Sequence, residues 1–137
     1  TERRRLALAV AREMAAQQRR TMRAQTAPDG TAWEPRKRPA RNARGDIRRR
    51  AQSAKVRAAM MRGLARPKWL KPAATPAEAS VGFVGSAARI AALHHHGGPD
   101  RVSPGGPVYD YPARPLLGIP PDLAERLRDL LVNHLGR

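Results

Sequence analysis

Residues 108–137 read VYDYPARPLLGIPPDLAERLRDLLVNHLGR, and their second half predicts the most regular element of the chain. Apolar residues recur there at helical spacing, at Leu123, Leu127, Leu130, Leu131 and Leu135. Pro120 and Pro121 suit the start of a helix, and Gly136 suits its end. The spacing therefore predicts a helix over residues 121–135 that packs one side against a core.

Outward from this helix, the preceding residues predict an extended segment. Pro112 and Pro115 have no backbone N–H to donate, so residues 108–117 suit the edge of a sheet. Residues 98–107, GPDRVSPGGP, hold three glycines that each adjoin a proline, and we expect a loop there.

A hairpin is predicted in the middle of the chain, where residues 68–85 read KWLKPAATPAEASVGFVG. Trp69 and Leu70 belong to its first expected strand. The alternation of Val81 with Phe83 predicts the second strand, beyond a proline-containing loop.

Three further helices and an arm complete the prediction. Residues 86–96 predict a short helix that Ser86 caps and that Gly97 and Gly98 end. Residues 54–65 predict another helix before Pro67. Residues 1–26 predict an amphipathic helix with a thin apolar stripe of Leu6, Val10, Met14 and Met22. Between these two helices, residues 27–53 are rich in Pro and Arg and predict an extended basic arm.

The chain of 137 residues is thus expected to form one α+β domain. A small antiparallel sheet is flanked by an N-terminal and a C-terminal helix, with the basic arm attached. The body spans residues 54–137. With 4% aromatic residues, the core must consist mainly of aliphatic side chains and Met.

Charge is distributed very unevenly along the chain. Residues 1–71 hold 21 Lys or Arg and 5 Asp or Glu, which accounts for the whole net charge of +16. Residues 72–137 hold 6 of each sign. A cationic half of this kind indicates a polyanion or an acidic protein as partner, and charge alone does not choose between them.

Residues that carry catalysis or bind metals are sparse. The absence of cysteine excludes disulfides and Cys-ligated zinc. His94, His95 and His96 are adjacent, so on a helix their rings diverge and do not chelate one ion. No phosphate-binding, nucleophile or dinucleotide motif appears. We therefore expect no enzyme, cofactor or metal site, and no membrane partner, because no apolar run approaches the roughly 20 residues of a span.

Several segments, in order, resemble the phage virion morphogenesis family: DGTAWEPRKR (29–38), KWLK (68–71), VGFVGSAARIAALHHHG (81–97) and residues 100–131. The most specific parts are WEPRK in the first segment, the pattern ARIA…H…G in the third and YPARPLLG in the last. The resemblance covers residues 2–135. The family usually has a polar residue and an aromatic where His95 and His96 stand here.

This resemblance implies a ring-forming neck protein without enzymatic activity. Such a protein completes the head-proximal end of the tail in temperate phages with contractile tails, and it enables head-to-tail joining. The implied partners are other copies of the chain, in a ring of about six in preference to twelve, the tail terminator or tail tube, and the head connector. DNA passes through the lumen. The implied location is the virion neck, after assembly in the bacterial cytoplasm.

Nine residues are expected to make subunit or partner contacts: Trp33, Pro35, Arg36, Lys37, Arg89, His94, Arg114, Pro115 and Leu116. The prolines around Arg114 reduce the entropy cost of holding its guanidinium against a carboxylate. Trp33 has other roles open to it, as a plug in its own core or, less favoured, as a ring that stacks on a base. For Leu116 a simple core position is favoured.

Arg48, Arg49 and Arg50 are expected to face DNA or an acidic partner. The alternative function is accordingly a basic protein that binds DNA without sequence preference.

Overall fold

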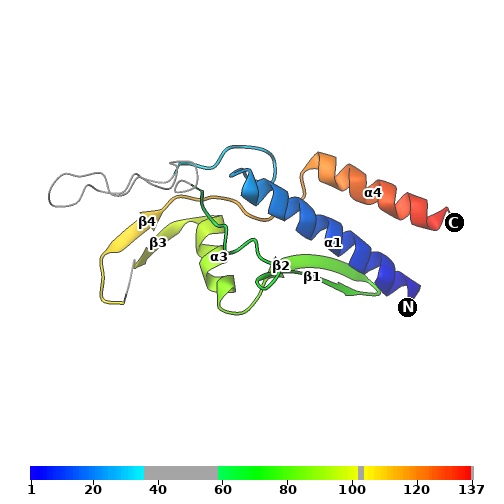
Figure 1. Ribbon diagram of the computed structural model, residues 1–137, viewed down its shortest axis with the longest axis horizontal. Helices are drawn as coiled ribbons and strands as arrows, with labels where there is room; N and C mark the ends of the chain where they lie inside the picture. Colours follow the sequence, from blue (N-terminus) through cyan, green and yellow to red (C-terminus); the bar gives the residue numbers. More distant parts are fainter. Residues whose placement is uncertain (36–58, 102–103, 137) are drawn as a thin grey trace.

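The computed structural model describes residues 1–35, 59–101 and 104–136. Its elements are α1 (Glu2–Arg23), β1 (Leu70–Thr75), β2 (Glu78–Phe83), α3 (Ala87–His96), β3 (Gly98–Arg101), β4 (Val108–Tyr111) and α4 (Pro121–Leu135). In Figure 1, α1 runs along the β1–β2 hairpin and α4 lies beside α1, whereas α3 and the β3–β4 hairpin occupy the other end. The α+β class is as predicted, but two separate two-stranded sheets replace the single small sheet.

Helix α1 confirms the predicted N-terminal helix and ends slightly earlier than residue 26. The Thr1 side chain caps it by accepting a hydrogen bond from the Arg4 N–H, at 3.2 Å. Its buried residues are Ala11, Met14, Ala15, Gln18, Thr21 and Met22. The buried face of the helix therefore combines three small side chains, Ala11, Ala15 and Thr21, with three larger ones.

The β1–β2 hairpin is antiparallel, with Leu70 opposite Phe83 and Thr75 opposite Glu78. Alternate β1 residues starting from Leu70 are the more buried, so this face meets α1 and the other face is exposed. The predicted hairpin is thereby confirmed, with its turn at Pro76 and Ala77.

The helix predicted over residues 54–65 is wrong for its described part, residues 59–65, which forms turns. Met61 has φ 63, a left-handed conformation that a helix excludes. Arg19 of α1 donates to the carbonyls of Ala65 and Leu70, at 3.0 and 2.8 Å. These long-range hydrogen bonds fix the turns and override the helix propensity of the segment.

Helix α3 ends as predicted at Gly97, but Ser86 makes no side-chain cap hydrogen bond. Gly97 has φ 73, and a Cβ there would lie 2.8 Å from the Ala113 backbone N. The loop predicted over residues 98–107 is wrong at its start, because Gly98–Arg101 pairs with Val108–Tyr111 as strand β3. Strand β4 confirms the first four residues of the predicted extended segment.

Helix α4 has the predicted bounds, with proline at its first turn. Leu123 and Leu127 pack against Ala11 and Met14 of α1 in one of two buried clusters. The second cluster holds Met22, Ala27, Trp33, Ala65, Leu70, Ala91 and Leu116. Arg126 bonds Gln17 at 2.7 Å, so α4 runs back along α1 from there toward the N-terminus.

The predicted arm is described only over residues 27–35. Thr26 pairs with Ala32 in an isolated antiparallel bridge, and the Trp33 N–H donates to the Gln25 carbonyl at 3.0 Å. This part of the chain therefore turns back onto the body. Residues 36–53 of the arm lie outside the described residues.

Candidate functional site

The indole of Trp33 lies in the core of its own chain. Trp33 is 6% exposed, and it belongs to the same buried cluster as Leu70 and Leu116, which are both 0% exposed. Its ring N–H donates to the Pro115 carbonyl at 2.9 Å. Trp33 is therefore an internal anchor that joins residues 27–35 to the segment before α4, and its ring is not free to stack on a base.

Arg114 binds the backbone of Glu34 and Pro35, the two residues that follow Trp33. Its Nε donates to the Glu34 carbonyl at 2.9 Å, its Nη2 approaches the Pro35 carbonyl at 3.4 Å, and the residue is 7% exposed. The expected carboxylate contact is thus corrected, because this guanidinium bonds backbone oxygens. Trp33 and Arg114 together fix the chain up to residue 35.

Gln25 binds the backbone of Met60, on the other side of the 36–58 segment in sequence. Its side-chain amide donates to the Met60 carbonyl at 2.9 Å and accepts from the Met60 N–H at 2.7 Å. Met60 also packs against the cluster that holds Trp33. The residues on either side of the 36–58 segment are therefore attached to one core.

The segment between these attachment points carries most of the charge. Residues 36–58 contain ten Lys or Arg and one Asp, a net +9 of the total +16. Arg36, Lys37, Arg48, Arg49 and Arg50 belong to it, so these expected contact residues lie outside the described residues.

On α3, Arg89 is an exposed residue that bonds Asp100 of β3 at 2.8 Å. Such a surface ion pair contributes little to stability. His94 packs edge-on against Tyr111, with ring centroids 5.6 Å apart, and its Nδ1 is buried without a hydrogen-bond partner. Burial, and secondarily the positive Arg114, lowers the pKa of His94.

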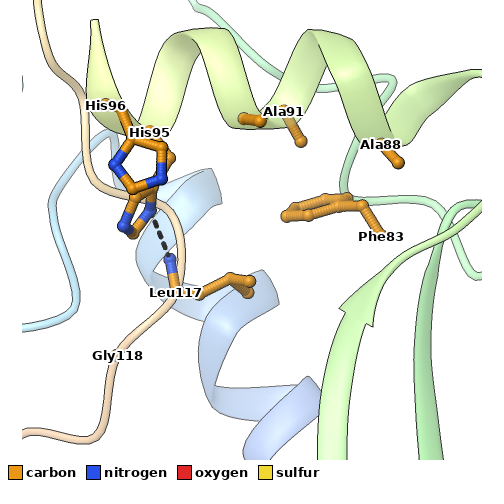
Figure 2. Close-up of a pocket in the computed structure, with 8 residues that line it drawn as sticks. Phe83, Ala88, Ala91, His95, His96, Leu117 and Gly118 are labelled. Carbon is orange, nitrogen blue, oxygen red and sulfur yellow. Dashed lines mark hydrogen bonds between the residues drawn. The ribbon is translucent and has the colours of Figure 1, made fainter.

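His95 links α3 to the segment before α4. Its Nδ1 accepts from the Leu116 N–H at 3.1 Å and lies 3.5 Å from the Leu117 N (Figure 2). The acceptor role requires the neutral ring, and burial followed by repulsion from His96 lowers the pKa of His95. The sequence singled out His94 but gave no sign that His95 was the residue with a structural hydrogen bond.

A cavity of about 410 Å³ lies beside His95, between α3, β2 and residues 117–118 (Figure 2). Phe83 and Leu117 face it from opposite sides, and alanines of α3 form much of its wall. Its lining has two histidines but no carboxylate, hydroxyl or ammonium group. The cavity suits apolar contact better than catalysis.

In the described part of the chain, no group of three His, Asp or Glu side chains is placed to hold a metal ion. None of the described helices combines the length and apolar character needed to cross a membrane.

The sequence of the chain is similar to those of known proteins over nearly its whole length. Residues 1–136 match the phage virion morphogenesis family. The chain belongs to this family. One similar protein is Tail completion protein S of Escherichia phage P2. It is 32% identical to this chain over 136 residues, which make up 98% of this chain and 85% of the relative. No solved structure matches the chain.

The match confirms the resemblance inferred from the motifs. In this member of the phage virion morphogenesis family, two of the most specific strings meet in space. WEPRK supplies Trp33 and the carbonyls of Glu34 and Pro35, and YPARPLLG supplies the Arg114 and Pro115 groups that bind them. These strings therefore encode one internal junction.

Proposed function

We propose that this protein is a phage tail completion protein, a structural virion component without enzymatic activity. The observation that carries the proposal is the similarity, over 98% of the chain, to a relative named Tail completion protein S. Because the similarity extends across all three described helices and both hairpins, it concerns the whole described fold.

The finer proposal places the protein in the neck of a contractile-tailed phage. Copies form a ring at the head-proximal end of the tail, in a hexamer in preference to a dodecamer, and this ring enables head-to-tail joining. The tail terminator or tail tube and the head connector are the flanking partners. Exposed apolar residues support an assembled state: Val108, Leu131, Val132 and Leu135 are between 39% and 78% exposed in the single chain.

The residues expected at interfaces now divide into two groups. Arg89 and Pro35 are exposed, and we propose direct contacts for them. Trp33, Arg114 and Leu116 are buried, so their proposed part is indirect: they hold residues 33–35 in position. Half-buried His94 and Pro115 belong to the same junction.

A lysate of phage carrying a nonsense mutation in the gene tests the proposal. The expected result in the electron microscope is DNA-filled heads and separate tails, with joined virions restored when the protein is supplied from a plasmid. Normal numbers of joined, infectious virions without the protein would refute the role.

A second candidate function is non-specific DNA binding, which the net charge of +9 in residues 36–58 favours. A mobility-shift experiment at two salt concentrations tests it. Retention of duplex DNA that falls steeply with salt would support this function, and the same weak retention at both concentrations would argue against it. Channel-facing arginines in a ring would reconcile the two candidates.

A further inference from the structure

A second, smaller cavity lies at the C-terminal end of α1. It has a volume of about 280 Å³ and lies between α1 and the turns that precede β1. Met22, Met61 and Pro67 give it apolar walls, and Arg23, Arg62 and Arg66 surround them. All three arginines are exposed. We call this feature the arginine pocket.

The guanidinium groups of the arginine pocket have no partner of their own. Over residues 1–35, 59–101 and 104–136, the hydrogen bonds and ion pairs engage Arg19, Arg20, Arg89, Arg101, Arg114 and Arg126, but none engages Arg23, Arg62 or Arg66. The lining contains no acidic residue. Three like charges around an apolar hollow suit a ligand that brings carboxylates or phosphates together with apolar groups.

Helix α4 carries a surface of complementary chemistry. Asp122, Glu125, Asp129 and Val132 are spaced i, i+3, i+7 and i+10, so they form one ridge along the helix. All four are exposed, on the side opposite the buried Leu123. None of the three carboxylates has an ion pair among the described residues. Exposed Leu135 lies three residues after Val132 at the C-terminal end of this acidic ridge, and exposed Arg126 and Arg128 border its sides.

The acidic ridge and the arginine pocket do not meet within one chain. The C-terminal half of α4 lies near the N-terminus of α1, where His134 is 3.8 Å from Glu2. The N-terminal half of α4, which carries Asp122 and Glu125, lies nearer, because Arg126 bonds Gln17, about 8 Å before Met22 along α1. The ridge is nevertheless on the outer side of α4, opposite Leu123, and no ion pair joins it to the pocket among the described residues (Figure 1).

We propose that the acidic ridge of one copy docks on the arginine pocket of the next copy, which deepens the proposed self-assembly and rests on it. Carboxylates of Asp122, Glu125 and Asp129 face the three guanidinium groups. Val132 and Leu135 cover the apolar walls around Met22 and Met61. Because the two surfaces differ, the contact is head-to-tail, and such contacts close into rings when the rotation between copies allows it.

Charge-reversal variants test this contact in purified protein by sedimentation velocity. Arg62→Glu with Arg66→Glu makes the pocket acidic, and Glu125→Arg with Asp129→Arg makes the ridge basic. Each double variant alone opposes like charges, and we expect self-association at least about tenfold weaker at low salt. A mixture of the two variants restores opposite charges at both kinds of junction, so association is expected to recover, with copies alternating.

Matched controls carry the same charge changes elsewhere. Lys71→Glu with Arg101→Glu and Glu78→Arg with Asp110→Arg alter exposed residues of the two hairpins that belong to neither surface, and both are expected to associate like the original protein. Circular dichroism checks that every variant is folded.

Three results would overturn the contact: a monomeric original protein at all concentrations, double variants that associate normally, or a mixture that does not recover. DNA retention lost in Arg62→Glu with Arg66→Glu, with self-association unchanged, would identify the pocket as a phosphate site and also overturn it. These readouts need no phage, so they are independent of the head-to-tail joining experiment. A protein that associates through the ridge but is dispensable for joining would refute the tail role alone.

Discussion

At the scale of single residues, a few buried or half-buried polar side chains hold distant parts of the chain together. Arg19, Gln25, His95 and Arg114 all bond backbone atoms of residues far away in sequence. The sequence pointed to Arg114 through its flanking prolines, but its partners are 79 and 80 residues away and leave no local signal. Arg19 and Gln25 were missed because a polar residue on or just after a basic helix is expected to face solvent.

Replacing Arg114 by Met tests the junction with residues 34–35. Met keeps much of the aliphatic volume but removes the donors to both carbonyls, so we expect a loss of about 1–3 kcal/mol in the free energy of unfolding. Urea denaturation measures it. The matched control Arg89→Met breaks only an exposed ion pair and is expected to cost about 0.5 kcal/mol or less. Equal effects of the two substitutions would contradict the assigned role of Arg114.

Stability is also expected to fall as the pH is lowered from 8 to 5. The folded-state pKa values of His94 and His95 lie below the ordinary value of 6.5, so the unfolded chain binds more protons over this range. The stabilisation is present above about pH 6.5 and is lost as the pH falls through the lowered values. The His94 ring faces Arg114 and Tyr111, and His95 faces His96 and the N–H groups before α4.

The variant His95→Asn separates the contribution of His95 to the pH dependence of stability from that of His94. The Asn side-chain oxygen replaces the acceptor Nδ1 and does not titrate, so the variant is expected to lose less stability between pH 8 and 5. Urea unfolding at several pH values measures the difference. An unchanged pH dependence would show that His95 is not the sensitive group. Asp29, whose pKa is lowered by hydrogen bonds from Thr31, loses its contribution only at still lower pH.

At the scale of elements, periodicity predicted α1, α4 and the β1–β2 hairpin because their own residues carry the pattern. Strand β3 escaped prediction since its four residues, GPDR, have no strand character and pair only because β4 is brought beside them. The opposite error occurred at residues 59–65, where good helix formers are held in turns by Arg19 and by the left-handed Met61. Both errors arise from long-range contacts that outweigh local propensity.

Replacing a leucine by alanine is expected to reduce stability much more on the buried side of α4 than on its exposed side. Leu123 is 0% exposed and Leu135 is 78% exposed. Leu123→Ala is therefore expected to cost about 2–5 kcal/mol in the free energy of unfolding, and Leu135→Ala about 0.5 kcal/mol or less. Thermal unfolding at a protein concentration where single chains dominate measures both. A similar loss for both would mean that α4 does not pack as described.

Gly97, at the junction of α3 and β3, is the glycine with the strictest requirement. Its φ is 73, and a Cβ would meet the backbone of residues 111 and 113. Gly97→Ala is expected to destabilise the fold by at least about 2 kcal/mol. Gly82→Ala is the control, because a Cβ there meets nothing within 4 Å. Unfolding midpoints that coincide for the two variants would contradict the close approach of the chain at Gly97.

At the scale of the whole molecule, more than half of the net positive charge of residues 1–71 lies in a single segment, residues 36–58. The 36–58 segment has a net charge of +9, and the residues that flank it are attached to one core through Trp33, Arg114 and Gln25. The α4 end of the molecule instead offers carboxylates beside exposed apolar residues. This polarity along the molecule favours head-to-tail assembly, and membership of the phage virion morphogenesis family agrees with an assembled virion role.

The position of the protein in the particle tests this account most directly. Virions that carry an affinity-tagged copy can be labelled with gold-conjugated antibody and imaged, both intact and as tails separated from heads. The account predicts label at the head-proximal end of separated tails. Label along the tail or at the baseplate, or virions that lack the protein altogether, would contradict it.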